Sequence, residues 1–292
     1  MNKILYNLAY FFYTFKRYGI LKKVLFLQEK KSSVGGIPFS HFESRNSGEN
    51  LILLHGLLDA SFGFRRLIPN LSKRWKLYIP DVPGFGKSKL PLIKFLLHLD
   101  IIAQIIYEFI SIKDLRNVTL VGHSMGGLLS QHLALLDAKK ENRISRLVLI
   151  SPGNQPHPQR DEIRSILFPR NRKEVLRLIH ELYYKDFPDP SPFLQDTLVY
   201  EWSLPIYEML AENTIEREKE IFIGKAVENI KVPTHIIAGE NDSITNLRAM
   251  KDLHSWIEGS TLDVVPLAKH AIHLEFPEIV AEIINKRGLL NS

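Results

Sequence analysis

The sequence predicts an α/β protein with a doubly wound, mostly parallel sheet and an inserted helical cap. From about residue 38 to residue 150, short aliphatic and β-branched runs alternate with helical patterns. The alternation stops between about 152 and 230, where the pattern is helical and broken by prolines, and it resumes at Val232. Such alternation is typical of a parallel sheet with helices on both faces. The middle block is therefore interpreted as an insertion into one α/β unit.

The hydrophobic pattern predicts the individual elements. A chain of 292 residues is long enough for one sizeable core and a smaller subdomain. We divide it into an N-terminal segment (1–31), a core (32–151 and 231–292) and a cap (152–230). Within the core we expect strands at 51–54, 77–80 and 147–150, a helix around 64–73, a long apolar helix from about 92 to 110 and a last helix from about 271 to 286.

The stretch 118–127 (VTLVGHSMGG) is the most informative part of the chain. Its first residues form a strand pattern, and a helical pattern follows immediately. Ser124 therefore lies at the apex of a sharp strand-to-helix turn, where a strained backbone would expose its hydroxyl above the sheet. Gly122 and Gly126 fit this turn, because a Cβ at either position would collide with neighbouring backbone.

A second motif follows an earlier strand. Residues 51–54 lead into His55 and Gly56, some seventy residues before the serine. Acyl transfer creates an oxyanion, and backbone N–H groups are suitable preorganised donors for it. The loop after Gly56 could present the N–H of Leu57, and the residue after the serine, Met125, could present the second. The Gly- and Pro-rich stretch 81–88 (DVPGFGKS) would by itself be an ordinary loop.

The remaining two motifs carry an acid and a base. The strand pattern at 235–239 runs into a loop with Glu240 and Asp242. Further on, a junction between a loop and a helix carries His270 and His273. The chain order of serine, acid and histidine is the order expected of α/β-hydrolases, and it differs from that of chymotrypsin-like and subtilisin-like enzymes.

On these motifs, the sequence resembles the α/β-hydrolase superfamily over residues 33–290. The resemblance implies that Ser124 is the nucleophile and that His270 is the general base and acid. It implies that Asp242 orients His270, while the N–H groups of Leu57 and Met125 form the oxyanion hole. Glu240 and His273 are the rivals for acid and base. His55 and His123 are expected to be structural.

Finer features narrow the chemistry that the resemblance implies. A serine at the turn speaks against dehalogenases and epoxide hydrolases, which need a carboxylate nucleophile. The stretch 167–175 (LFPRNRKEV) is similar to the cap of the monoacylglycerol-lipase-like branch, which includes bacterial lipases. The cap is rich in large apolar side chains, and those that do not hold the cap together could line a pocket for an acyl chain.

Composition limits the partners and cofactors. The excess of 38 basic over 32 acidic residues equals the net charge of +6 within residues 1–31, so the rest of the chain is balanced and nucleic acid is not an expected partner. The chain has no cysteines, which fits a reducing, cytoplasmic compartment. The histidines show no pattern that indicates a metal site, and we expect neither a metal nor an organic cofactor.

The N-terminal segment combines basic and aromatic residues. Its longest charge-free run, Ile4–Phe15, has twelve residues, whereas a transmembrane helix needs about twenty. Lysine and arginine interleaved with aromatic residues favour a helix lying in the interface of an anionic membrane, which would place the protein peripherally on the inner membrane face. The alternative is a helix packed on the protein's own hydrophobic surface.

The sequence thus predicts a serine hydrolase that cleaves carboxylic esters, a lipase or carboxylesterase acting on acyl glycerols or related lipids. One alternative is an esterase for a methyl ester on acyl carrier protein, which the basic cap residues would dock; acids interrupt those residues, so a solvated helix face is preferred. A second alternative is a carbon–carbon bond hydrolase of the same fold. A non-catalytic binding module is the third, disfavoured by the intact serine, acid and histidine.

Overall fold

A computed structural model describes residues 3–185 and 188–286 of the chain, and only the backbone of residues 3–9. Positions 1–2, 186–187 and 287–292 of the predicted segments lie outside the described residues. The described part contains an eight-stranded sheet in the order β1-β2-β4-β3-β5-β6-β7-β8. The β1/β2 and β2/β4 pairs are antiparallel and the others are parallel. The strands are β1 (Gln28–Val34), β2 (Ile37–Glu43), β3 (Glu49–Leu54), β4 (Trp75–Pro80), β5 (Val118–His123), β6 (Ile144–Ile150), β7 (Thr234–Gly239) and β8 (Thr261–Val265).

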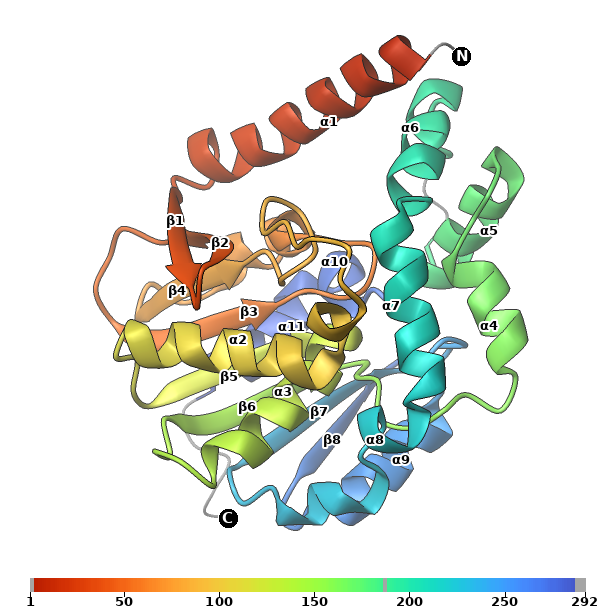
Figure 1. Cartoon of the computed structure of the whole chain (residues 1–292). Coiled ribbons are helices and arrows are strands. Elements are labelled where there is room, and N and C mark those ends of the chain that lie inside the picture. Colours follow the sequence, from red (N-terminus) through yellow and green to blue (C-terminus); the bar gives the residue numbers. More distant parts are fainter. Residues whose placement is uncertain (1–2, 186–187, 287–292) are drawn as a thin grey trace.

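Helices cover both faces of this sheet, as predicted for a doubly wound fold (Figure 1). In β3, Ile52 and Leu54 belong to one apolar cluster and Leu51 and Leu53 to the other, because successive strand residues point to opposite faces. The core helices are α2 (Leu99–Ile112), α3 (Met125–Asp137), α9 (Leu247–Trp256), α10 (Ile272–Glu275) and α11 (Pro277–Asn285). Residues of α2, α3 and α9 belong to the first cluster, and residues of α11 to the second.

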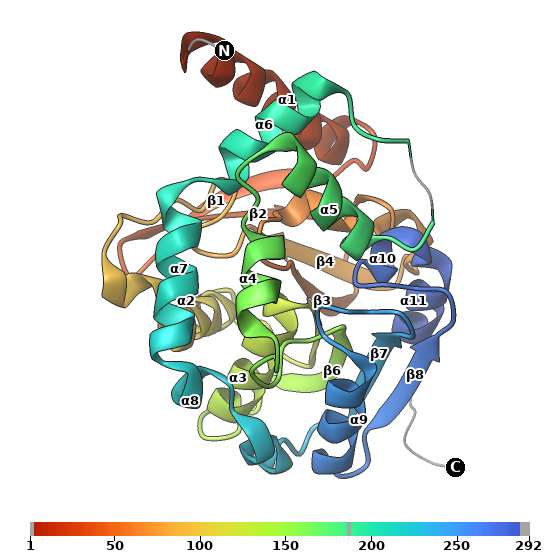
Figure 2. The same ribbon diagram turned by 90° about the vertical axis from the view of Figure 1, so that its right-hand side faces the viewer.

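The chain between β6 and β7 is helical. Figure 2 shows α4 and α5 in front of the sheet, with α6 and α7 beside them. The elements are α4 (Arg160–Leu167), α5 (Arg172–Leu182), α6 (Pro192–Trp202), α7 (Pro205–Glu216), α8 (Glu218–Ile221) and the 3₁₀ helix η4 (Gly224–Asn229). We refer to these elements together as the cap.

The N-terminal helix α1 (Lys3–Lys23) lies along the edge of the molecule, and its N-terminal end is beside α6 (Figure 1). Tyr18 and Leu21 on its inner face are buried in the second apolar cluster. Strand β1 begins at Gln28, so the last residues of the predicted N-terminal segment belong to the sheet.

Three predicted helices differ from the observed elements. The helix expected around 64–73 is replaced by two short 3₁₀ helices, η1 (Ser61–Arg65) and η2 (Ile68–Asn70), the second with a proline in its first turn. The helix expected from about 92 begins only at Leu99, after the 3₁₀ helix η3 (Lys94–Leu97) and an extended His98. The last helix is divided between α10 and α11, because Pro277 cannot continue the backbone hydrogen bonds of the preceding turn.

Candidate active site

The turn between β5 and α3 places Ser124 at the carboxyl edge of the sheet. Its backbone has φ 53° and ψ −116°, a conformation that is unfavourable for a residue with a side chain. Neighbouring glycines make the turn feasible: a Cβ on Gly126 would lie 2.1 Å from the carbonyl oxygen of Leu54. The N–H of Ser124 donates to Ile150 and its carbonyl accepts from Gly153, so the strained backbone is held from both sides.

The loop after β3 lies next to this turn. Leu57 follows Gly56, and Leu58 adopts a positive φ of 60°. Among the described residues, the N–H of Leu57 donates to no protein acceptor. The N–H of Met125 has no acceptor within α3, because it is the first residue of that helix. Both residues line the same cavity as Ser124, so the geometry is compatible with two free backbone donors near its hydroxyl.

The predicted acid and base meet across two loops. Nδ1 of His270 lies 2.9 Å from Oδ2 of Asp242, and both side chains are almost fully buried. Asp242 also accepts the N–H groups of Ile244 and Thr245 and the Thr245 hydroxyl. Burial raises the pKa of Asp242, but the attraction of His270 and these hydrogen bonds outweigh it, so its pKa lies below the ordinary value. Asp242 therefore stays ionised beside the imidazole.

The two rivals occupy different surroundings. Glu240 is exposed to solvent and makes no ion pair among the described residues. His273 is buried, and neither of its ring nitrogens has a hydrogen-bond partner in the described part of the chain. Burial, with Arg65 and His270 nearby, lowers the pKa of His273 to about 3. His273 is thus held neutral, and Asp242 pairs with His270 instead.

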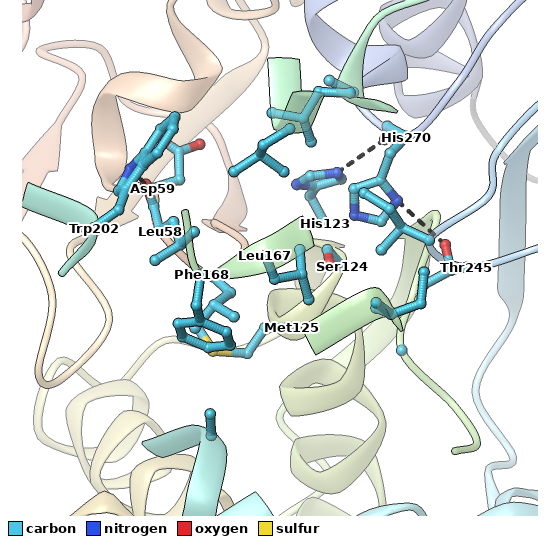
Figure 3. Close-up of a pocket in the computed structure, with 18 of the residues that line it drawn as sticks. Leu58, Asp59, His123, Ser124, Met125, Leu167, Phe168, Trp202, Thr245 and His270 are labelled. Carbon is cyan, nitrogen blue, oxygen red and sulfur yellow. Dashed lines mark hydrogen bonds between the residues drawn. The ribbon is translucent and has the colours of Figure 1, made fainter. Parts of the chain in front are cut away.

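The other two histidines near the site make structural contacts. Nε2 of His123 donates to the carbonyl oxygen of His270 at 3.0 Å and so holds the backbone of the candidate base (Figure 3). Nε2 of His55 accepts the N–H of Val82, and its Nδ1 lies 2.8 Å from the carbonyl of Gly56. Burial lowers the pKa of His55 and, together with His273 and His270, that of His123.

Leu57, Ser124, Met125 and His270 line one cavity of about 640 Å³ between core and cap. Figure 3 shows Ser124, His270 and Met125 on its core side and Leu167, Phe168 and Trp202 contributed by the cap. No hydrogen bond joins the Ser124 hydroxyl to His270 among the described residues. Nδ1 of His270 faces Asp242, and its Nε2 makes no hydrogen bond to another described residue.

Sequence reasoning missed several residues that shape the site. Oγ1 of Thr245 bonds Oδ2 of Asp242 at 2.9 Å and lies 3.4 Å from Nδ1 of His270. Nε1 of Trp202 donates to the carbonyl of Leu58 at 3.0 Å, which ties the cap to the loop after β3. Thr245 lies only three residues beyond Asp242, so its hydrogen bond to that carboxylate could have been expected from the sequence. Nothing in the sequence indicates the contact between Trp202 and Leu58.

A buried ion cluster adjoins the cavity and was also missed. Arg17 of α1 donates from Nη1 to Oε1 of Glu201 at 3.0 Å, and its Nη2 lies 3.5 Å from Oδ1 of Asp59. Burial acts against the charge of Arg17, but Tyr13, Glu201 and Asp59 keep its pKa above the ordinary value. The helix α1 therefore forms part of the cavity wall, through Tyr13 and Arg17.

The described residues contain no group of three or more histidine and acidic side chains placed to hold a metal ion. None of their helices combines the length and the apolar character that crossing a membrane requires.

Known proteins share this architecture. A family profile described as alpha/beta hydrolase fold matches residues 49–187. An uncharacterized hydrolase of Bacillus subtilis, YugF, is 25% identical over 280 residues, covering 87% of this chain and 96% of the relative. A monoacylglycerol lipase of Xenopus laevis is 23% identical, covering 91% and 84%. A 2-hydroxy-6-oxo-6-(2'-aminophenyl)hexa-2,4-dienoic acid hydrolase of Metapseudomonas resinovorans is 22% identical, covering 86% and 87%.

Among solved structures, a membrane phospholipase A described as a bacterial virulence factor superimposes with a TM-score of 0.80 at 20% identity, covering 96% of this chain and 94% of the other. At that identity the likeness establishes the fold. The family profile, the relatives and this solved structure agree on the α/β-hydrolase fold, which the eight-stranded sheet and its helices also have. The protein is a hydrolase.

Because His273 is buried in its neutral form, we expect the free energy of unfolding to depend on pH. The pKa of His273 in the folded state lies below the value of about 6.5 for an unfolded chain. Its contribution to stability is therefore complete above pH 6.5 and is lost as the pH falls from there towards 3. At pH 5.5 the loss is roughly 1.4 kcal/mol for this group. Urea unfolding at pH 7.5 and 5.5 should show a smaller pH difference for His273→Leu than for the natural chain.

The exposed His254 provides the control for this experiment. His254→Gln should leave the difference between the two pH values unchanged. Equal pH differences in the natural chain and in His273→Leu would contradict the assignment of His273 as a buried neutral side chain.

Proposed function

We propose that the protein is a serine hydrolase that cleaves carboxylic esters with a long acyl group, as a lipase or carboxylesterase does. The observation that carries this proposal is that Ser124 and His270 line the same large, mostly apolar cavity, while Asp242 is bonded to Nδ1 of His270. Ser124 lies at a strained turn, and Leu57 and Met125, the residues with the candidate N–H donors, line the same cavity. This is the combination of groups that acyl transfer requires.

The proposed reaction proceeds in two halves. Oγ of Ser124 attacks the ester carbonyl carbon while Nε2 of His270 takes the hydroxyl proton. The N–H groups of Leu57 and Met125 stabilise the oxyanion, and Asp242 stabilises the imidazolium. The tetrahedral intermediate collapses, and the alcohol leaves with the proton from His270. Water, activated by the same imidazole, then attacks the acyl-enzyme and releases the acid and the free serine.

The cavity supports an acyl substrate. Its walls are mostly aliphatic and aromatic, and Leu128, Leu167, Phe168 and Leu198 contribute from core and cap. A volume of about 640 Å³ is within the range of pockets that enclose a small-molecule ligand. Among the charged groups of the wall, Arg17 pairs with Glu201 and lies near Asp59.

A series of esters tests this proposal. We expect kcat/KM to rise from p-nitrophenyl acetate to the medium-chain esters, and monoacylglycerols to be hydrolysed. Leu167→Trp, which places a larger ring in the cavity, should lower kcat/KM for the longer esters by about tenfold or more, because one or two methylene groups in an apolar pocket carry such discrimination. Acetate should be affected much less. A preference for acetate in the natural chain would contradict a lipid substrate.

Carbon–carbon bond hydrolysis is the second candidate, because relatives of similar identity include a hydrolase of a ring-cleavage dienoate. A ring-cleavage dienoate is coloured, so its consumption can be followed directly by absorbance. Turnover of the dienoate without turnover of any ester would favour this second candidate.

The structure offers less support for acyl carrier protein as a partner. Four of the basic cap residues are paired with acids of the cap itself. The pairs are Arg160–Glu218 at 2.9 Å, Arg170–Glu208 at 2.7 Å, Arg172–Asp196 at 2.6 Å and Arg177–Glu162 at 3.1 Å. A surface compensated in this way has little net charge left to attract an acidic carrier.

A further inference from the structure

Helix α1 has two chemically different faces. At 100° per residue, Phe11, Phe12, Phe15, Lys16, Gly19, Lys22 and Lys23 share one arc, which we call the outer face. The phenylalanine side chains are 61%, 63% and 67% exposed. Tyr13, Arg17, Tyr18 and Leu21 share the opposite arc, the inner face, which lies against the protein. The two arcs do not overlap around the helix axis.

The inner face fixes the helix on the protein. The Tyr18 hydroxyl donates to Oδ2 of Asp81 at 2.7 Å, and Arg17 bonds Glu201 of the cap. Tyr10 makes an edge contact with Tyr200 at a ring distance of 5.8 Å. Because these contacts are spread along the helix, α1 lies flat against the protein. It cannot enter a bilayer end-on without breaking them. Asp81, in the stretch interpreted as an ordinary loop, is one of its anchors.

The outer face has the chemistry of a lipid-binding surface. The ring of Phe11 lies 5.8 Å from that of Phe12 and 6.3 Å from that of Phe15, so the three form a continuous aromatic ridge. The sequence of α1 contains no acidic residue. Among the described residues, Lys16 and Lys23 have no ion-pair partner, whereas Lys22 pairs with Glu29. Aromatic rings suit the boundary between headgroups and acyl chains, and uncompensated lysines suit anionic phosphates.

We propose that the outer face of α1 docks flat on an anionic phospholipid bilayer. The positive charge and the exposed aromatic ridge lie on the same arc, which favours a lipid surface over a second copy of this chain. The inner face contributes Tyr13 and Arg17 to the cavity wall, so the bilayer would lie one helix away from the acyl site. The biological role of this docking rests on the lipid-ester function proposed above, because docking would bring the cavity close to lipid substrates. The docking itself can be measured separately.

Gly19 offers a sharp test. It lies in the middle of the outer face, and a Cβ there would meet no heavy atom within 4 Å. Gly19→Glu and Gly19→Lys add side chains of similar length and similar helix propensity, with opposite charge. We would measure co-sedimentation of the full chain with vesicles of equal parts phosphatidylcholine and phosphatidylglycerol. Gly19→Lys should bind at least as tightly as the natural chain, and Gly19→Glu about tenfold more weakly.

Replacement of the ridge tests the apolar contribution. The triple variant Phe11→Ser, Phe12→Ser, Phe15→Ser should lose vesicle binding. The control is a triple serine variant of Leu92, Ile93 and Phe95, which are exposed to a similar extent before α2 and should leave binding unchanged. Phosphatidylcholine vesicles should bind the natural chain much more weakly than the anionic ones.

The outcomes separate the two proposals. Failure of the natural chain to bind anionic vesicles, or equal binding by the Glu and Lys variants, would overturn the docking surface. A dimer that the ridge variant abolishes, without vesicle binding, would assign the outer face to a second copy instead. If vesicle binding follows the expected order but no ester is hydrolysed, the docking surface stands and the proposed function fails. Hydrolysis of soluble p-nitrophenyl butyrate should be the same in both Gly19 variants.

Discussion

Ser124→Ala is expected to lower kcat for ester hydrolysis by about 10⁴- to 10⁶-fold, because removal of the proposed nucleophile leaves only the proposed oxyanion donors and substrate binding to accelerate the reaction. The variant should also lose covalent labelling by a fluorophosphonate. Hydrolysis of p-nitrophenyl butyrate and gel-based labelling measure the two effects. Alanine keeps the Cβ that the turn already accommodates, so the backbone hydrogen bonds of Ser124 to Ile150 and Gly153 should persist.

The exposed Ser255 of α9 is the matched control for this substitution. Ser255→Ala should retain full activity and labelling. If Ser124→Ala retained hydrolysis close to that of the natural chain, with the same substrate and a folded protein, neither the ester nor the carbon–carbon reaction could depend on this serine.

Asp242→Asn should lower kcat by about 10³- to 10⁴-fold while the protein remains folded. The carboxylate accepts the N–H groups of Ile244 and Thr245 together with the proton on Nδ1 of His270. An asparagine amide can turn its NH₂ group towards Nδ1, which would favour the wrong tautomer and leave Nε2 unable to accept the serine proton. Steady-state kinetics with one medium-chain ester is sufficient to measure the loss.

Glu240→Gln is the control, because Glu240 precedes Asp242 by two residues but is exposed. Activity should be unchanged in this variant. A large loss in Glu240→Gln together with a small loss in Asp242→Asn would exchange the roles of the two acids.

The strand-to-helix turn at Ser124 could be predicted from sequence because its signal is local. The strand pattern, the two glycines and the helix pattern all lie within 118–137, and the backbone conflict that the glycines relieve involves only adjacent elements. The acid and the histidine follow strands whose parallel order brings their carboxyl ends to one edge. Asp242 and His270 pair at 2.9 Å because the parallel strands β7 and β8 are neighbours in the sheet, not because the two residues are close in the sequence.

Apolar periodicity misled the prediction where the side chains are not buried. Leu92, Ile93 and Phe95 extend the apolar pattern of α2 towards the N-terminus, but they are exposed in the loop before it. The helix begins only after His98, whose backbone is extended. At 64–73 the chain forms two short 3₁₀ helices, η1 and η2. They bury Phe64 and Ile68, so these apolar side chains reach the core without a regular α-helix.

Contacts between distant segments had no signal in the sequence. Arg17 and Glu201 are separated by 184 positions, and their ion pair exists only because α1 packs against α6. The basic N-terminal segment was expected either to face a membrane or to pack on the protein. The structure gives α1 a buried face and an exposed face, and docking of the exposed face on lipid stays a proposal.

The hydrogen bond from Trp202 to Leu58 links access and reactivity. Trp202 ends α6, and its acceptor is the carbonyl one residue beyond the candidate donor Leu57. An outward swing of the cap would have to break this bond or pull the loop with it, and a backbone N–H is an effective oxyanion donor only while its direction is fixed. The N–H of Leu57 would then be correctly oriented only while the cap covers the cavity. With the cap open, water could enter, but the oxyanion donor that hydrolysis needs would be displaced.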